Sequence, residues 1–203
     1  MLIIPPTVLV PKPSDFPHRE DIEDLLQKRR EANITQGFII RPNKTPLLPF
    51  SFTADININN NRLWQLFLVL AKDLPNSVCC TYGLNGEDPV TTDYMPKTDI
   101  LATFSRFEKE LTMDCSFEYS LLYHTKAMLM EVAVTESKYI KFSGSDKEKL
   151  LQQMAVFGLH ETRSISFIDE HPKVVLPIQQ VMPSARRTAD VLWSFNRAFG
   201  VEQ

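Results

Sequence analysis

The sequence has few of the residues from which recognisable active sites are built. Its six glycines are scattered along the chain, so it contains no glycine-rich loop of the kind that cradles a phosphate group. It also contains neither a GxSxG nucleophile elbow nor an HExxH zinc motif. No catalytic residue can therefore be predicted from a motif.

Cysteine and histidine are equally sparse. The three cysteines are Cys79, Cys80 and Cys115, and two adjacent cysteines do not form an ordinary structural disulfide. No CxxC pair is present, and the four histidines share no ligand spacing. The sequence therefore predicts no metal site and no cofactor. Free thiols are typical of a reducing compartment, so a cytoplasmic protein is expected.

Long apolar runs and an excess of positive charge are also missing. No run approaches the ~18 apolar residues that span a bilayer, and the first ten residues lack the basic region of a signal peptide. The formal net charge is −3, which disfavours a general nucleic-acid binder. Two basic clusters, Lys28-Arg29-Arg30 and Arg186-Arg187, are interpreted as residues on helix surfaces. We therefore expect neither nucleic-acid nor membrane binding.

The chain is otherwise an ordinary globular sequence. Its 203 residues are 43% apolar and 23% charged, which is enough to bury one core. Neither an internal repeat nor a long linker divides it, so residues 1–203 are predicted to form a single domain. Residues 1–18 are rich in proline and are predicted to be an extended arm, with a short edge strand at 7–10.

The clearest pattern is an alternation of apolar and polar residues over 115–125 and again over 128–134. A period of two is typical of strands with one buried face and one solvent-exposed face. A two-residue loop at 125–126 is predicted to connect them. This hairpin pairs Tyr123 with Met128, Leu121 with Met130, and Tyr119 with Val132.

A third strand is predicted to complete an antiparallel meander over about 115–142. A helix follows, in which Ser145 and Glu148 form a predicted capping box. Its apolar stripe should lie across the apolar face of the meander. The sequence therefore predicts an α+β fold, with a largely antiparallel sheet and helices mainly on one face.

Other segments have weaker but readable patterns. Helices are predicted at 19–31, 62–72, 98–111 and 185–199, and strands at 34–41, 47–58, 77–84, 164–168 and 173–178. The segment 85–96 has no predicted helix or strand, and it contains Glu87, Asp88 and Asp93. Long loops of this kind are often functional, although a simple solvated connector has the same composition.

Two acids of the meander form the best candidate for catalysis. The predicted register makes Glu118 and Glu131 diagonal neighbours, with side chains about 5–8 Å apart. A glycosidase or a divalent-metal site uses such a pair. Two solvated acids on an exposed sheet face are the simpler alternative. A small-ligand site in an aromatic pocket is a third alternative.

The same face is predicted to have an apolar centre. Leu122 and Leu129 lie opposite each other in the predicted register, and Tyr139 lies on their face. A charged rim around an apolar centre is typical of an interaction surface, although another element of the chain covering these residues would explain the same pattern. The rim consists of Glu118, Glu131, Lys141 and His124.

We therefore expect a non-catalytic cytoplasmic protein that binds another protein. Small acidic α+β proteins of this kind include inhibitors and toxin-neutralising immunity proteins, and this comparison is an analogy of size and charge. A homo-oligomer is also compatible with the sequence. The predicted partner-binding residues are Leu122, Leu129, Tyr139, Glu118, Glu131, Glu87, Asp88 and Asp93.

Overall fold

A computed structural model describes residues 2–45 and 47–201. Its centre is an eight-stranded sheet in which every neighbouring pair of strands is antiparallel. The strand order is β2-β3-β9-β8-β7-β4-β5, and β6 pairs with β4. The strands are β2 (Gly37–Pro42), β3 (Phe52–Asn57), β4 (Ser77–Leu84), β5 (Val90–Thr91), β6 (Met95–Pro96), β7 (Phe117–His124), β8 (Leu129–Val134) and β9 (Ile140–Gly144).

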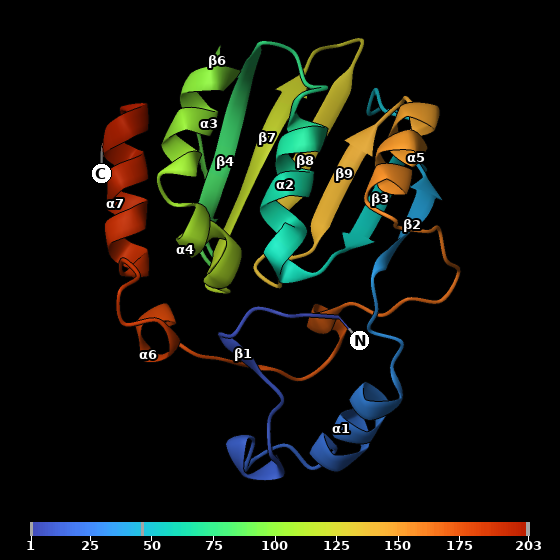
Figure 1. Cartoon of the computed structure of the whole chain (residues 1–203), viewed down its shortest axis with the longest axis vertical. Helices are drawn as coiled ribbons and strands as arrows, with labels where there is room; N and C mark the ends of the chain where they lie inside the picture. Colours follow the sequence, from blue (N-terminus) through green and yellow to red (C-terminus); the bar gives the residue numbers. More distant parts are fainter. Residues whose placement is uncertain (1, 46, 202–203) are drawn as a thin grey trace.

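Helices cover one face of this sheet. Figure 1 shows most of them in front of the strands, with α7 at the side of the sheet next to α3 and α4. They are α2 (Asn60–Ala71), α3 (Lys97–Ser105), α4 (Glu108–Met113), α5 (Lys147–Val156) and α7 (Thr188–Phe199). The predicted α+β fold, with a largely antiparallel sheet and helices mainly on one face, is confirmed.

The remaining elements lie at one end of the sheet (Figure 1). They are α1 (Ile22–Glu31), α6 (Ile178–Val181) and a two-stranded sheet of β1 (Val8–Leu9) and β10 (Val174–Val175). The predicted strand at 7–10 therefore exists, but it pairs with β10 and not with the edge of the main sheet. Two short 3-10 helices occur at Pro13–Asp15 and Ile168–Glu170.

Helix α2 is the centre of the core, as its apolar sequence predicts. Leu66, Phe67 and Leu70 are fully buried. The Phe67 ring stacks on Trp64 at a centroid distance of 5.3 Å and meets the edge of Tyr119 at 5.2 Å. Aromatic pairs at these distances add to the stability that burial alone provides.

The predicted helix 98–111 is in fact two helices, α3 and α4, with a break at Arg106–Phe107. The buried positions are nevertheless correct, because Ile100, Phe104, Phe107 and Leu111 all belong to the core. Phe104 and Phe107 both pack on Phe195 of α7, at 5.1 and 5.3 Å. The break lets both rings reach this third aromatic side chain.

The meander is confirmed, but its predicted register is wrong. Tyr123 lies opposite Met130 and Leu121 opposite Val132, so β8 is displaced by two residues from the prediction. A four-residue loop, 125–128, connects the strands. The Thr125 hydroxyl accepts hydrogen bonds from the amides of Ala127 and Met128, which stabilises this longer loop. A shift of two residues leaves every side chain on its predicted face.

Three smaller predictions are also corrected. Asp146, not Ser145, caps α5, because its carboxylate accepts the Lys149 amide at 3.0 Å. The segment 164–168 is not a strand, and it leads into the 3-10 helix at Ile168–Glu170. The segment 85–96 is not merely a loop, because it contributes β5 and β6 to the sheet.

Candidate functional site

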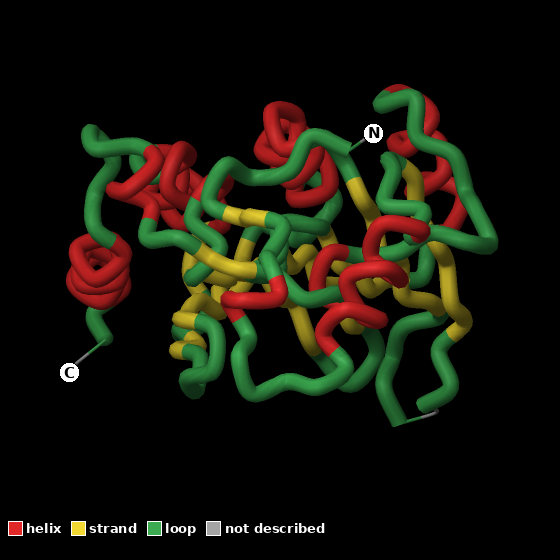
Figure 2. The backbone as a smooth tube through the Cα atoms, turned by 90° about the horizontal axis from the view of Figure 1, so that it is seen from below, coloured by secondary structure: helices red, strands yellow, loops and turns green. Residues whose placement is uncertain are grey.

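The side of the sheet opposite the helices is called here the open face. It consists of the alternate residues that point away from the core, among them Ser120 and Leu122 of β7, and Leu129 and Glu131 of β8. Figure 2 shows the sheet between the helical layer above it and loops with fewer helices below it. Two open clefts lie on this face.

The first cleft, of ≈170 Å³, lies over β4, β7 and β8. The second cleft, of ≈480 Å³, lies over β2, β3, β8 and β9. Glu131, Ala133 and Lys141 line both clefts. Because they share these three residues, the two clefts adjoin and form one polar depression across the middle of the sheet.

Glu131 is the central titratable group of this depression. Burial raises the pKa of its carboxyl group, while the Ser120 hydroxyl and the Lys141 ammonium group lower it. The Ser120 hydroxyl is itself buried and makes no hydrogen bond of normal geometry with any described residue, so its effect on Glu131 is that of a nearby dipole. A half-buried carboxyl group with a raised pKa in a cleft is a candidate for binding or for proton transfer.

Glu118 also lines the first cleft, but it is not a diagonal neighbour of Glu131 as predicted. Leu122 is the residue opposite Glu131, and Glu118 is four positions away along β7. At the usual rise per residue, this places their Cα atoms about 13 Å apart along the strand. A retaining glycosidase needs a much shorter separation, so the structure does not favour that chemistry.

The second cleft contains charged residues that the sequence analysis did not select. Arg41 and Asp55 form an ion pair between β2 and β3, and Asp169 and Glu170 face them from the C-terminal half of the chain. These residues are far apart in the sequence, and only the pairing of β2 with β3 and the path of segment 165–170 bring them together. The sequence signal for Arg41 and Asp55 was the alternation of polar residues in the predicted strands 34–41 and 47–58, whereas Asp169 and Glu170 lie in the connection between the predicted strands 164–168 and 173–178.

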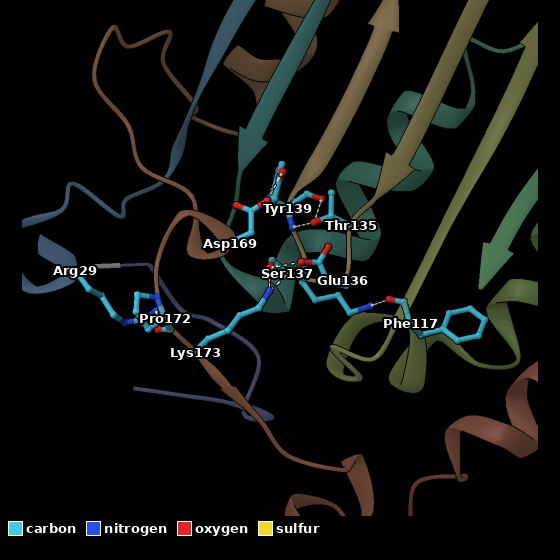
Figure 3. Close-up of polar contacts among 10 residues, drawn as sticks. Arg29, Phe117, Thr135, Glu136, Ser137, Tyr139, Asp169, Pro172 and Lys173 are labelled. Atoms are coloured by element: carbon cyan, nitrogen blue, oxygen red, sulfur yellow. Dashed lines mark hydrogen bonds and ion pairs between the residues drawn. The ribbon is translucent and has the colours of Figure 1, made fainter. Parts of the chain in front are cut away.

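Tyr139 is not an exposed contact residue, which corrects the prediction. It is only 5% exposed, because Phe167 covers its ring at a centroid distance of 4.6 Å. Its hydroxyl donates a hydrogen bond of 2.8 Å to Asp169, as Figure 3 shows. The alternative of intramolecular cover is therefore correct at Tyr139, and the covering element is segment 165–170.

A second set of contacts extends this cover to residue 173. It joins Lys173 to the turn between β8 and β9 (Figure 3). The Lys173 ammonium group binds the Glu136 carboxylate at 2.9 Å and also donates to the Ser137 hydroxyl. Burial by itself raises the pKa of Glu136, but the hydrogen bonds from Lys173 and Ser137 outweigh it, so the pKa is lowered. Segment 165–173 is thus fixed at one end of the open face.

Leu122 and Leu129 are both half-buried, so the predicted apolar patch is neither fully exposed nor hidden. They are not opposite each other, because Leu129 pairs with His124. The amide of Leu129 donates to the Pro49 carbonyl oxygen at 2.8 Å, which places the loop between β2 and β3 beside the patch. Binding of a partner at these leucines stays a prediction.

The acidic residues of segment 85–96 are exposed but separated. Glu87 and Asp88 follow β4, whose last residue, Leu84, pairs with the first residue of β7. Asp93 lies between β5 and β6, closer to the level of Leu122 along the strands. A partner on the leucine patch therefore comes nearer to Asp93 than to the other two acids.

The fold and the two clefts define a class: an α+β protein whose antiparallel sheet is covered by helices on one face and has a polar depression on the other. No protein-family model matches the chain, and no curated protein or solved structure is detectably similar to it. Over residues 2–45 and 47–201, no cluster of three or more metal-ligating side chains occurs. None of the helices in these ranges is long and apolar enough to cross a membrane.

Proposed function

We propose that this protein binds another protein through the open face of its sheet. The observation that carries the proposal is the half-buried leucine pair, Leu122 and Leu129, beside the Glu131 carboxylate and the polar depression. A partly apolar centre with a charged rim is the usual anatomy of a protein interface. An inhibitor or an immunity-type protein acts through such a surface without catalytic residues.

The chemistry of the thiols supports a proposed compartment. Cys79, Cys80 and Cys115 are all free and buried, and burial raises the pKa of each thiol. Free cysteines are typical of proteins from a reducing compartment such as the cytoplasm. The three free thiols therefore support, as part of this proposal, a binding function in such a compartment.

Matched surface variants test the proposed interface. Leu122→Lys puts a charge at the centre of the open face, while Val156→Lys does the same on α5, on the other side of the sheet, where Val156 is 82% exposed. Immobilised wild-type protein should retain a specific protein from a native lysate. Leu122→Lys should lose that protein and Val156→Lys should keep it, with both variants folded by circular dichroism. Equal retention by both variants contradicts the proposal.

One observation favours a second candidate, an enzyme that uses Glu131 as a general acid or base. Its carboxyl group lies in an open cleft with a pKa raised by burial, and Lys141 lies close to it. A catalytic role requires this pKa to lie near the working pH. An NMR titration in which Glu131 titrates near neutral pH supports the enzyme, and titration in the ordinary range of glutamate favours the binding protein.

A further inference from the structure

A second surface, on the helical side of the molecule, has a different chemistry from the open face. A groove of ≈470 Å³ lies between the end of α3 and the outer side of α7. Three arginines line it: Arg106, Arg186 and Arg197. The exposed Trp193 lines it as well, with 52% of its surface accessible. A cationic, aromatic groove on a chain of net charge −3 is a local feature that the overall composition conceals.

Two of the three guanidinium groups of this groove lie over aromatic rings. Arg186 lies over the Phe107 ring at 4.7 Å, and Arg197 lies over Trp193 at 5.4 Å. A ring face attracts a cation but leaves the N–H groups at its edge free to bind an anion. Within the described part of the chain, none of the three arginines forms an ion pair. Asp190, an acid of α7, pairs instead with Arg187.

Arg186 is fixed in this position by further hydrogen bonds. Its guanidinium group donates to the Arg106 carbonyl oxygen at 2.9 Å, and its backbone amide donates to the Glu110 carboxylate at 2.8 Å. The interpretation of Arg186 as a helix-surface residue is therefore wrong, because it precedes α7 and spans to the break between α3 and α4. The Arg186 side chain is therefore held in place before any ligand arrives, which lowers the entropic cost of binding.

We propose that this groove binds an acidic segment of a protein partner, with an apolar side chain of that segment against Trp193. Arginine and tryptophan are the residues most enriched at interface hot spots, and uncompensated guanidinium groups match carboxylates in charge and in shape. A nucleic-acid surface usually buries more than about 1,000 Å² and is strongly basic throughout, whereas this groove has a volume of ≈470 Å³ and lies on a chain of net charge −3. This binding site is separate from the open face and does not depend on it.

Trp193 provides a direct probe. The chain has two tryptophans, and Trp64 is only 8% exposed, so acrylamide should quench chiefly the fluorescence of Trp193. The probe ligands are a short peptide of alternating Glu and Leu, the same peptide with Lys for Glu, and a single-stranded oligonucleotide. At low salt, the acidic peptide should protect Trp193 from quenching, and the basic peptide should not.

Arginine variants then show whether the affinity for the acidic peptide depends on the arginines of the groove or only on the net charge of the protein. The double variant Arg106→Gln/Arg197→Gln should weaken binding of the acidic peptide by about tenfold or more. The single charge reversal Arg197→Glu should act in the same direction. Arg187→Gln, which changes a neighbouring ion-paired arginine outside the groove, should change binding less than about twofold.

Three results overturn the proposal. The first is a lack of protection of Trp193 by the acidic peptide at low salt. The second is an equal loss of affinity in Arg187→Gln, which indicates a general charge effect. The third is tighter binding of the oligonucleotide than of the peptide, which identifies the groove as a nucleic-acid site. All substituted side chains are exposed, so the variants should fold, and circular dichroism checks that they do.

Discussion

At the scale of single residues, Glu131 is the acidic side chain that both clefts of the open face share. Its carboxyl group is half-buried, and burial raises its pKa. A raised pKa in the folded state means that folding disfavours the ionised form. Glu131 therefore costs stability at neutral pH, which is common for groups kept for binding or chemistry.

Glu131→Gln should therefore leave the protein equally stable or stabilise it by up to about 1 kcal/mol at pH 7, the scale of one hydrogen bond. The penalty from Glu131 grows as pH rises from the unfolded-state pKa to the folded-state pKa, so the difference between variant and wild type should vanish at lower pH. Urea unfolding at several pH values measures this. Glu118→Gln is the control, and a clear loss of stability in Glu131→Gln at pH 7 contradicts the expectation.

Tyr139 contributes both a ring contact and a hydrogen bond. Tyr139→Phe removes only the bond to Asp169 and should cost about 0.5–1.5 kcal/mol. Tyr139→Ala also removes the packing on Phe167 and should cost about 3–5 kcal/mol, as large aromatic truncations do. Thermal or urea unfolding compares the two variants. Equal losses in both would mean that the ring packing contributes nothing.

At the scale of elements, the hairpin of β7 and β8 positions the open face. Its register decides which side chains lie opposite one another: Glu131 lies opposite Leu122 with the four-residue loop, whereas the predicted two-residue loop would place it opposite Ser120. The core side of the same pair places Leu121 against Val132, both fully buried. The same backbone hydrogen bonds between β7 and β8 therefore fix the positions of the side chains on both faces. A test of the register on the core side also tests the register on the open face.

Leu121→Ala should cost about 2–5 kcal/mol, because it leaves a cavity in a fully buried site. Combined with Val132→Ala, its effect should depart from additivity by about 0.5–3 kcal/mol, as expected for residues in contact. The control pairs Leu121→Ala with Ile56→Ala on β3, three strands away, where the two effects should add. Urea melts of the single and double variants give the coupling, and an additive Leu121–Val132 pair rejects this register.

At the scale of the whole molecule, segment 165–173 is held to the end of the sheet by polar contacts between residues far apart in the sequence. Lys173 and Glu136 are each 16% exposed at the side chain, and they pair across 37 positions of sequence. Together with the Tyr139–Asp169 bond, they hold segment 165–173 against one end of the open face. The size of the second cleft depends on this segment, because Phe167, Asp169 and Glu170 line it.

Lys173→Met should destabilise the protein by about 1–3 kcal/mol at pH 7, since it leaves a partly buried carboxylate without its cation. In the wild type, the lowered pKa of Glu136 contributes stability above the unfolded-state pKa of glutamate. That contribution is lost as pH falls through the folded-state pKa. The variant should lose this part of the pH dependence, which unfolding curves between neutral and acidic pH measure.

Hydrogen exchange gives a second readout of the same change. In Lys173→Met, amides of segment 165–173 should exchange faster than in the wild type, while those of α2 should not change. Lys147→Met is the matched control, because Lys147 makes only an exposed contact of 3.8 Å with Glu161, and such pairs contribute little. Uniform acceleration across the chain would indicate global destabilisation instead of release of the segment.

Local patterns in the sequence were enough to determine the α+β class, most helices and strands, and the face to which each meander residue belongs. These features depend on periods of two and of about 3.6 residues, which are visible within one segment. The absence of recognisable catalytic motifs is a property of the sequence alone. Four predicted segments of the core lie within two residues of the observed bounds of α2, β4, β7 and β8: 62–72, 77–84, 115–125 and 128–134.

Tertiary structure alone decided the register, the cover over Tyr139 and the grouping of charges. A shift of two residues keeps every apolar side chain on its face, so alternation cannot distinguish Val132 from Met130 as the partner of Leu121. Segment 165–170 reaches Tyr139 by a path that no local pattern encodes. One groove contains Arg106, Arg186 and Arg197 because α3 and α7, which are far apart in the sequence, pack together on the aromatic core. Such long-range contacts follow from the packing of the whole chain.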